Sequence, residues 1–286
     1  MPLPAQFVPL GFSLTAVFTW GISDFVGGYA AKRANAFLVT LIAHLSGMVL
    51  MGTLAWLHHD AIPSPHALEW ALAAGAAGGF ALAVFYRALA AGNMGLTAPV
   101  AAVLGAVIPT IFGILTEGLP GIAPIFGFVL AALGIWLISR AEISSQGESR
   151  RPAGLGLAVL AGIGFAGFYL FIKQAGDASG LWLLVASKLA SAVITGAIFL
   201  LGQNSGGLNR SGAGFGVVAG CLDVTGSFLF IRASQTGRLD SAVVISSLYP
   251  VITVLLARLI LKEHFTRWKV VGMVAALLAV PLIAWP

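Results

Sequence analysis

The sequence predicts an all-α integral membrane protein whose ten transmembrane helices form two inverted five-helix repeats. Apolar residues make up 59% of the 286 positions and charged residues 9%, and the mean hydropathy is +0.98. So little polar surface cannot cover a soluble globule. Apolar runs of about twenty residues, enough to cross a hydrocarbon core, recur along the chain. The two halves also match at an offset of about 145 residues, which aligns Arg87 with Arg232 and Gly92 with Gly237.

Each span is predicted from its apolar length at 1.5 Å rise per residue. The first half contains five such segments, at residues 9–31, 37–57, 68–88, 96–115 and 122–139. The second half contains five more, at residues 154–172, 181–201, 214–231, 242–261 and 270–285. A repeat with an odd number of spans must enter the membrane from opposite sides in its two copies, so the halves are expected to have inverted topology.

A charged stretch, RAEISSQGESRRP at residues 140–152, separates the two halves. Five of its thirteen residues are ionisable, which predicts a hinge loop in water. The expected organisation is therefore a first five-helix repeat at 1–139, a charged hinge loop at 140–152 and a second five-helix repeat at 153–286. The net charge of +5 is scattered over short loops, which argues against a nucleic-acid partner and fits loops beside anionic lipid.

Small residues recur three or four positions apart within the third and eighth predicted spans, at Gly75 and Gly79 and at Gly216 and Gly220. Such spacing allows helix backbones to approach closely. It indicates either tight packing alone or helices that slide or bend during a conformational cycle. Prolines within the fourth and ninth spans, including Pro250, free backbone carbonyls that could bend a helix or face a cavity.

Four ionisable residues fall well inside predicted spans: Asp24, His44, Lys188 and Asp223. A charge at membrane depth costs about 2.5 to 3.5 kcal/mol on insertion scales, so these residues need partners. Depth suggests pairing Asp24 with His44 and Lys188 with Asp223. Two interpretations remain open: the pairs hold helices together, or the groups line the pathway and bind a proton or a charged substrate group.

Aromatic and hydroxyl residues complete the candidate pathway, although aromatic side chains near span ends also serve as interfacial anchors. Tyr249 is the best placed, beside Pro250 and just after Ser246. The full set predicted for the substrate or ion pathway is Trp20, Asp24, His44, Tyr86, Tyr169, Lys188, Asp223, Ser246 and Tyr249. Glu117 and Glu263 close the fourth and ninth spans, where a carboxylate meets the N-terminus of the next helix, so both are interpreted as structural.

Several short motifs carry a resemblance to a known family. WGISDF at residues 20–25, the late Glu117 and Glu263, and SSLYPVITVLL at residues 246–256 resemble the ten-helix EamA family of the drug/metabolite transporter superfamily. The resemblance implies a secondary transporter with a central cavity between two five-helix repeats, similar to bacterial exporters of amino acids and other small metabolites. We expect the cavity to be lined chiefly by spans one, three, four, six, eight and nine. Leu104 stands where Pro250 would project, so the fourth and ninth spans are not expected to bend alike.

The sequence bears on three classes of function: a secondary transporter, an intramembrane enzyme, and a channel or structural scaffold. A secondary transporter, expected to export small metabolites such as amino acids by alternating access, explains the duplication and the buried charges together. The alternative is a drug or other solute permease, or a facilitative channel, without proton coupling. An enzyme is not expected, because no HExxH, GxSxG or GxxxxGK[ST] string occurs. No cofactor or metal is expected. The expected partners are a small-molecule substrate, protons as candidate coupling ions, and membrane lipids, with the chain acting as a monomer or homodimer.

The expected location is the bacterial cytoplasmic (inner) membrane, as a multi-pass protein. Its orientation is left open by two opposing indications. Outside the deep Lys188, eleven Lys and Arg residues follow odd-numbered spans and three lie on the other side. The positive-inside rule then places both termini outside, whereas the family resemblance places both in the cytoplasm.

Overall fold

A computed structural model of the protein describes residues 7–91, 94–143, 154–176, 178–202, 207–262 and 266–283. Eleven helices and no strand occur within these ranges. In chain order they are α1 (Phe7–Ala31), α2 (Ala36–Leu57), α3 (Pro65–Ala91), α4 (Met94–Glu117), α5 (Ile122–Ile143), α6 (Leu155–Gln174), α7 (Gly180–Leu201), α8 (Arg210–Thr236), α9 (Leu239–Ser246), α10 (Tyr249–Leu261) and α11 (Arg267–Ile283).

These helices confirm the ten predicted spans. Eight segments are long and apolar enough to cross a membrane, and α9 and α10 together count as one of them, of 23 residues. The apolar parts of α5 and α11 supply the two shorter segments, at Ile122–Leu137 and Val270–Ile283. α5 continues to Ile143, so the first four residues of the predicted hinge are helical. Residues 144–152 of that hinge, like Glu263, lie outside the described residues.

The ninth span was predicted as a single segment, but the structure divides it into two helices, α9 and α10. Pro250 is the second residue of α10. It has no N–H, so the Ser246 carbonyl lacks its helical donor. The chain turns tightly instead: the Ser247 N–H donates to Val243 O and the Leu248 N–H to Ile245 O. The equivalent α4 remains one helix although it contains two prolines, so the fourth and ninth spans do not bend alike.

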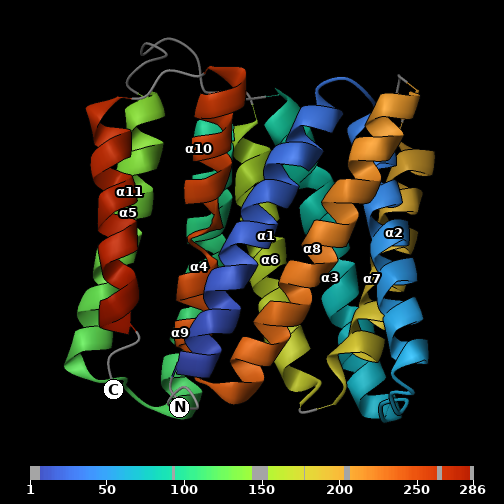
Figure 1. Ribbon diagram of the computed structural model, residues 1–286, viewed down its shortest axis with the longest axis horizontal. Coiled ribbons are helices and arrows are strands. Elements are labelled where there is room, and N and C mark those ends of the chain that lie inside the picture. The colour runs from blue at the N-terminus through green and yellow to red at the C-terminus, as the bar shows by residue number, and fades with distance from the viewer. Residues whose placement is uncertain are drawn as a thin grey trace.

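The contacts between helices repeat when the two halves are exchanged. α1 packs mainly on α8 and α3 packs mainly on α6, which pairs the first helix of each half with the third helix of the other. α2 packs on α7, and α5 packs on α11, as equivalent helices (Figure 1). The two halves are therefore related by a pseudo-two-fold axis.

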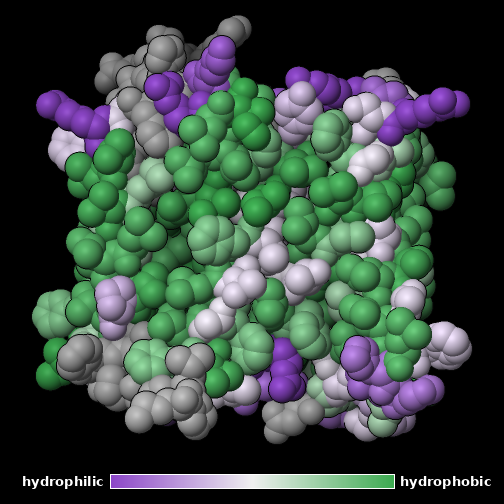
Figure 2. All heavy atoms as spheres, in the orientation of Figure 1, coloured by the Kyte–Doolittle hydropathy of each residue, from purple (hydrophilic) through white to green (hydrophobic). Residues whose placement is uncertain are grey.

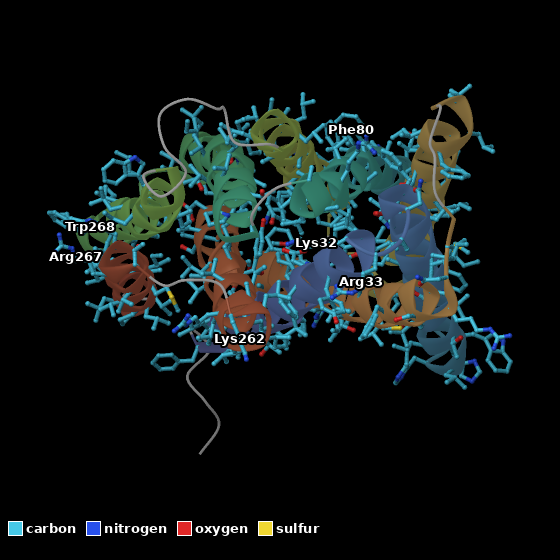
Figure 3. The ribbon with its side chains drawn as sticks, turned by 90° about the horizontal axis from the view of Figure 1, so that it is seen from above. Lys32, Arg33, Phe80, Lys262, Arg267 and Trp268 are labelled. Carbon is cyan, nitrogen blue, oxygen red and sulfur yellow. The ribbon has the colours of Figure 1, made fainter. Side chains whose placement is uncertain are left out.

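The direction of the chain is inverted between the halves. In Figure 1, α1 begins and α11 ends at the lower edge. Five crossings carry the first half from the lower edge to the upper edge, so α6 begins at the upper edge. Consistently, Gly154, which precedes α6, lies against the carbonyl of Ala88 near the end of α3. An apolar band separates hydrophilic side chains at the two edges (Figure 2), and basic residues of the upper edge, among them Lys32, Arg33 and Arg267, are labelled in Figure 3.

Glycine permits the closest approaches, at equivalent places in the two halves. A Cβ on Gly75 of α3 would lie 2.0 Å from the Ser187 carbonyl oxygen of α7. A Cβ on Gly220 of α8 would lie 2.1 Å from the Ala43 carbonyl oxygen of α2. Any larger residue would push these backbones apart. The tight-packing interpretation of the small-residue spacing is thus confirmed, and sliding of these helices stays a prediction.

A group of four charged side chains, Glu117, Lys173, Arg238 and Asp240, joins the two halves at the lower edge; we call it the lower-edge network. The Glu117 carboxylate accepts from the Leu239 N–H at 3.2 Å and lies 3.8 Å from Lys173 Nζ. Glu117 therefore lies at a helix N-terminus, as expected. The helix is α9, however, and not α5, which follows Glu117 in the chain. Arg238 donates to both oxygens of Asp240, at 3.1 and 2.7 Å, and this hydrogen bonding raises the pKa of Arg238.

Candidate functional site

A central cavity lies among helices of both halves. It measures about 40 Å³, room for a few water molecules and far less than a metabolite needs. Its lining residues come from α1, α3, α6, α7, α8 and α10: Trp20, Asp24, Gly78, Leu82, Phe165, Phe168, Tyr169, Ser187, Lys188, Ser191, Asp223, Ser227 and Tyr249. The expected lining is corrected in one respect, because α7 contributes three side chains and α4 none of those that line it.

Lys188 on α7 and Asp223 on α8 form an ion pair at the cavity wall, with Nζ 2.5 Å from Oδ2. The two side chains are 6% and 13% exposed. At this depth each charge neutralises the other, which lowers the cost of burying both. The pairing predicted from membrane depth is confirmed.

The Asp223 backbone is also held by its neighbours. The Trp20 Nε1–H of α1 donates to the Asp223 carbonyl at 3.1 Å, and the Ser227 hydroxyl donates to the same oxygen at 2.9 Å. Trp20 can approach so closely because position 226 is glycine: a Cβ there would lie 2.6 Å from Trp20 Cδ1. One turn further along α1, Ser23 donates to the Ala219 carbonyl at 2.8 Å. These bonds fix α1 against α8 at the depth of the cavity.

Asp24 presents a carboxylate to the cavity without a protein partner. The residue is 6% exposed, lines the cavity, and makes no hydrogen bond or ion pair to any described residue. Asp223 lies near enough to repel it as a like charge, and the hydroxyls of Tyr86, Tyr169 and Tyr249 lie within its electrostatic reach. Asp223 neutralises the positive charge of Lys188. The negative charge of an ionised Asp24 is therefore not balanced by a cation among the residues that line the cavity.

Aromatic rings form the wall beside Asp24. The Trp20 ring lies 6.0 Å from Tyr169 and 6.3 Å from Tyr249, measured between centroids. Phe230 packs behind them, 4.8 Å from Tyr169. Tyr249 is 4% exposed, and its hydroxyl has no hydrogen-bond partner among the described residues. These side chains line an interior cavity and are not interfacial anchors.

His44 does not pair with Asp24, so that expectation is wrong. His44 is 1% exposed, and neither ring nitrogen has a hydrogen-bond partner among the described residues. It lies on α2, which packs against α7 and α8, whereas α1 packs mainly on α8. Lys188 is within its electrostatic reach. Equal depth placed the two residues in one layer of the membrane, but their helices make only minor contact with each other.

Of the nine predicted pathway residues, the structure brings six together around the cavity: Trp20, Asp24, Tyr169, Lys188, Asp223 and Tyr249. Three lie outside its lining. Besides His44, Tyr86 is fully buried with its hydroxyl 3.5 Å from the hydroxyl of Ser23, and Ser246 is buried at the break in the ninth span with no partner among the described residues.

Sequence reasoning missed the serines of the cavity. Ser191 follows Lys188 by three residues and Ser187 by four, and Ser227 follows Asp223 by four. Residues three or four apart lie on the same helix face, so their spacing from the two buried charges was the signal that could have found them. Ser191 also donates to the Gly75 carbonyl at 2.8 Å, which holds α7 on α3.

Comparison with known proteins agrees with this architecture. The sequence model of the EamA-like transporter family matches residues 152–285. The second half of the chain is therefore similar to members of the EamA-like transporter family. The crystal structure of another protein has the same fold. It shares 14% sequence identity with this chain, with a TM-score of 0.73, and the match covers 97% of each chain. No curated protein matches the chain.

The EamA-like match confirms the resemblance predicted from the short motifs. Together with the eight apolar helices long enough to cross a membrane, it supports a multi-pass membrane protein. The match covers the second half, which supplies Tyr169, Lys188, Asp223 and Tyr249 to the cavity. The first half, whose contacts mirror those of the second, supplies Trp20 and Asp24. At 14% identity the solved structure shows the fold alone.

Proposed function

We propose that the protein is a secondary active transporter that exports small metabolites with apolar or zwitterionic character, such as amino acids, by alternating access. One observation carries the proposal: a cavity containing buried ionisable groups lies at the interface of two inverted repeats. Inverted repeats can rock against each other around a fixed central site, which exposes that site to each side of the membrane in turn.

The small volume of the cavity supports the alternating cycle. Ligand sites of metabolite size occupy several hundred cubic ångströms, whereas this cavity measures about 40 Å³. The repeats must therefore separate before a substrate enters. The lower-edge network holds α4 of the first repeat on α6 and α9 of the second, so opening toward that edge requires breaking it. We propose that the network forms and breaks in each cycle.

Export can be tested in cells. Expression of the protein should raise tolerance to toxic analogues of amino acids, relative to cells carrying an empty vector. Fluorescence of a tagged copy verifies that the protein reaches the membrane. Unchanged tolerance across a broad panel of analogues, with the protein present in the membrane, would contradict amino-acid export.

Counterflow in liposomes separates a carrier from a channel, and an imposed pH gradient separates a proton-coupled carrier from a permease without proton coupling. A carrier should accumulate labelled amino acid transiently against a preloaded unlabelled pool, whereas a channel only equilibrates it. An imposed pH gradient should then drive net uptake if protons are coupled. Equal net uptake with and without the gradient would favour the facilitative alternative.

A further inference from the structure

The unmatched carboxylate of Asp24 indicates what part of a substrate the cavity recognises. We propose that Asp24 binds the primary ammonium group of the transported solute, with the Tyr249 hydroxyl as a second ligand. The inference rests on the proposed function and narrows it to solutes that carry a primary amine. It stands on the position of Asp24 in the cavity, on its lack of a partner among the described residues, and on the neutralisation of Lys188 by Asp223.

A buried carboxylate without a partner is costly, because no water at membrane depth replaces the missing hydrogen bonds. Lys188, the cation of the cavity, is bound to Asp223. His44, on α2, is within the electrostatic reach of Lys188, and the other ionisable groups that interact with Asp24 are Asp223 and the hydroxyls of Tyr86, Tyr169 and Tyr249. None of these groups supplies a positive charge to Asp24. The positive charge that balances Asp24 must therefore come from a bound solute.

A primary ammonium group fits this environment. Its three N–H donors match the two carboxylate oxygens of Asp24 and the free hydroxyl of Tyr249. Trp20 and Tyr169 line the same cavity, and aromatic rings can attract cations. A solute that offers Asp24 only an anionic or uncharged group would leave the carboxylate unpaired.

The other residues that line the cavity indicate which chemical groups the solute carries besides its ammonium group. α3 and α6 contribute Leu82, Phe165 and Phe168 to the lining, and these side chains suit an apolar side chain of the solute. Lys188 Nζ has three N–H donors and uses one on Asp223, so it can also donate a hydrogen bond to the carboxylate of a zwitterion. The predicted class is therefore small primary amines with an apolar body, of which apolar amino acids are members.

Binding to the purified protein in detergent tests the proposal, read out as a rise in the thermal unfolding midpoint. The probes are three sets built on alanine, leucine and phenylalanine, each containing the L-amino acid, its N-acetyl derivative and its decarboxylated amine. We expect the amino acid and the amine of at least one set to stabilise the protein. The N-acetyl derivative, which lacks the ammonium group, should bind about 10- to 100-fold more weakly, the range of a charge-assisted hydrogen bond.

Two variants locate the effect. Asp24→Asn should lose the stabilisation by amines, yet unfold no earlier than the wild type without ligand, because it removes an unpaired buried charge. Asp60→Asn is the matched control: it makes the same chemical change at the lower edge, where Asp60 accepts a hydrogen bond from Ser179, and should keep the response to amines.

Each other outcome counts against the proposal. Equal binding of amino acids and N-acetyl derivatives, or full binding by Asp24→Asn, would overturn it. So would early unfolding of Asp24→Asn, which would show that the carboxylate has a structural role. Tolerance of cells to toxic amino-acid analogues, measured alongside, separates the two hypotheses: tolerance without ammonium selectivity overturns only the role of Asp24, whereas absence of both tolerance and binding overturns the proposed function as well.

Discussion

The cavity pair, Lys188 with Asp223, and the lower-edge network place opposite charges together in two different environments. The cavity pair lies inside the bundle, with side chains 6% and 13% exposed, and joins two helices of one repeat. In the lower-edge network Lys173 and Glu117 are 32% and 24% exposed and connect the two repeats. Only Asp240 is fully buried there. The comparison suggests that deep charges organise the binding site, whereas charges at the edge control the relative position of the repeats.

The largest effect is expected when one member of the cavity pair is removed. Asp223→Asn or Lys188→Gln alone leaves its partner buried and unpaired, a change that typically costs about 3 to 5 kcal/mol in folded proteins. The double variant removes both charges and should regain most of that stability. Thermal unfolding of the purified proteins, followed by the loss of monodisperse material after heating, measures the difference.

The double variant also separates structure from coupling. If the pair moves protons, folding should return while pH-dependent transport stays lost. Full recovery of pH-dependent transport in the double variant would leave only a structural role for the pair.

A smaller effect is expected at the lower edge. Arg238→Ala leaves the fully buried Asp240 carboxylate without its cationic partner, which should cost about 1 to 3 kcal/mol, the usual range for an unsatisfied buried group. Arg232→Ala is the control and should change little, because Arg232 lies on the exposed surface of α8, where its side chain donates to Gln235. A loss equal to that of the cavity-pair variants would contradict the distinction between the two regions.

The smallest effect is expected for Glu117→Gln. The amide oxygen can still accept from the Leu239 N–H, so only the charge at the N-terminus of α9 and the partly exposed pair with Lys173 are lost. Each is typically worth about 0.3 to 1 kcal/mol. Since salt screens exposed charges, the difference from the wild type should shrink as the salt concentration rises. A difference that is independent of salt would indicate that Glu117 acts by packing.

Much of the fold could be predicted from the sequence, because membrane thickness fixes the length of each span and the duplication fixes the arrangement of the halves. The Lys188–Asp223 pair could be predicted because burial at membrane depth requires compensation. The prediction of an Asp24–His44 pair was wrong, because depth in the membrane says nothing about the direction in which a side chain points around its helix. That direction depends on which helices pack together, and α1 packs on α8 rather than on α2.

The details of the cavity depended on packing as well. The seventh span was not expected in its lining, yet close contact at Gly75 brings Ser187 and Ser191 beside the cavity. The break in the ninth span followed from Pro250, but the two prolines of α4 leave that helix continuous. A proline in the sequence therefore marks where a helix can bend, and the neighbouring helices decide whether it does.

The paired contact of α5 with α11 has a consequence for the ancestry of the chain. Gly134 of α5 lies against the Gly272 carbonyl of α11, so that a Cβ there would come within 2.7 Å of that oxygen. Two equivalent helices that pack on each other are what a five-helix chain would form with a second, oppositely inserted copy of itself. A single chain that contains both copies needs no further interface, and each half can differ in sequence: α4 is one helix, whereas its counterpart is divided into α9 and α10.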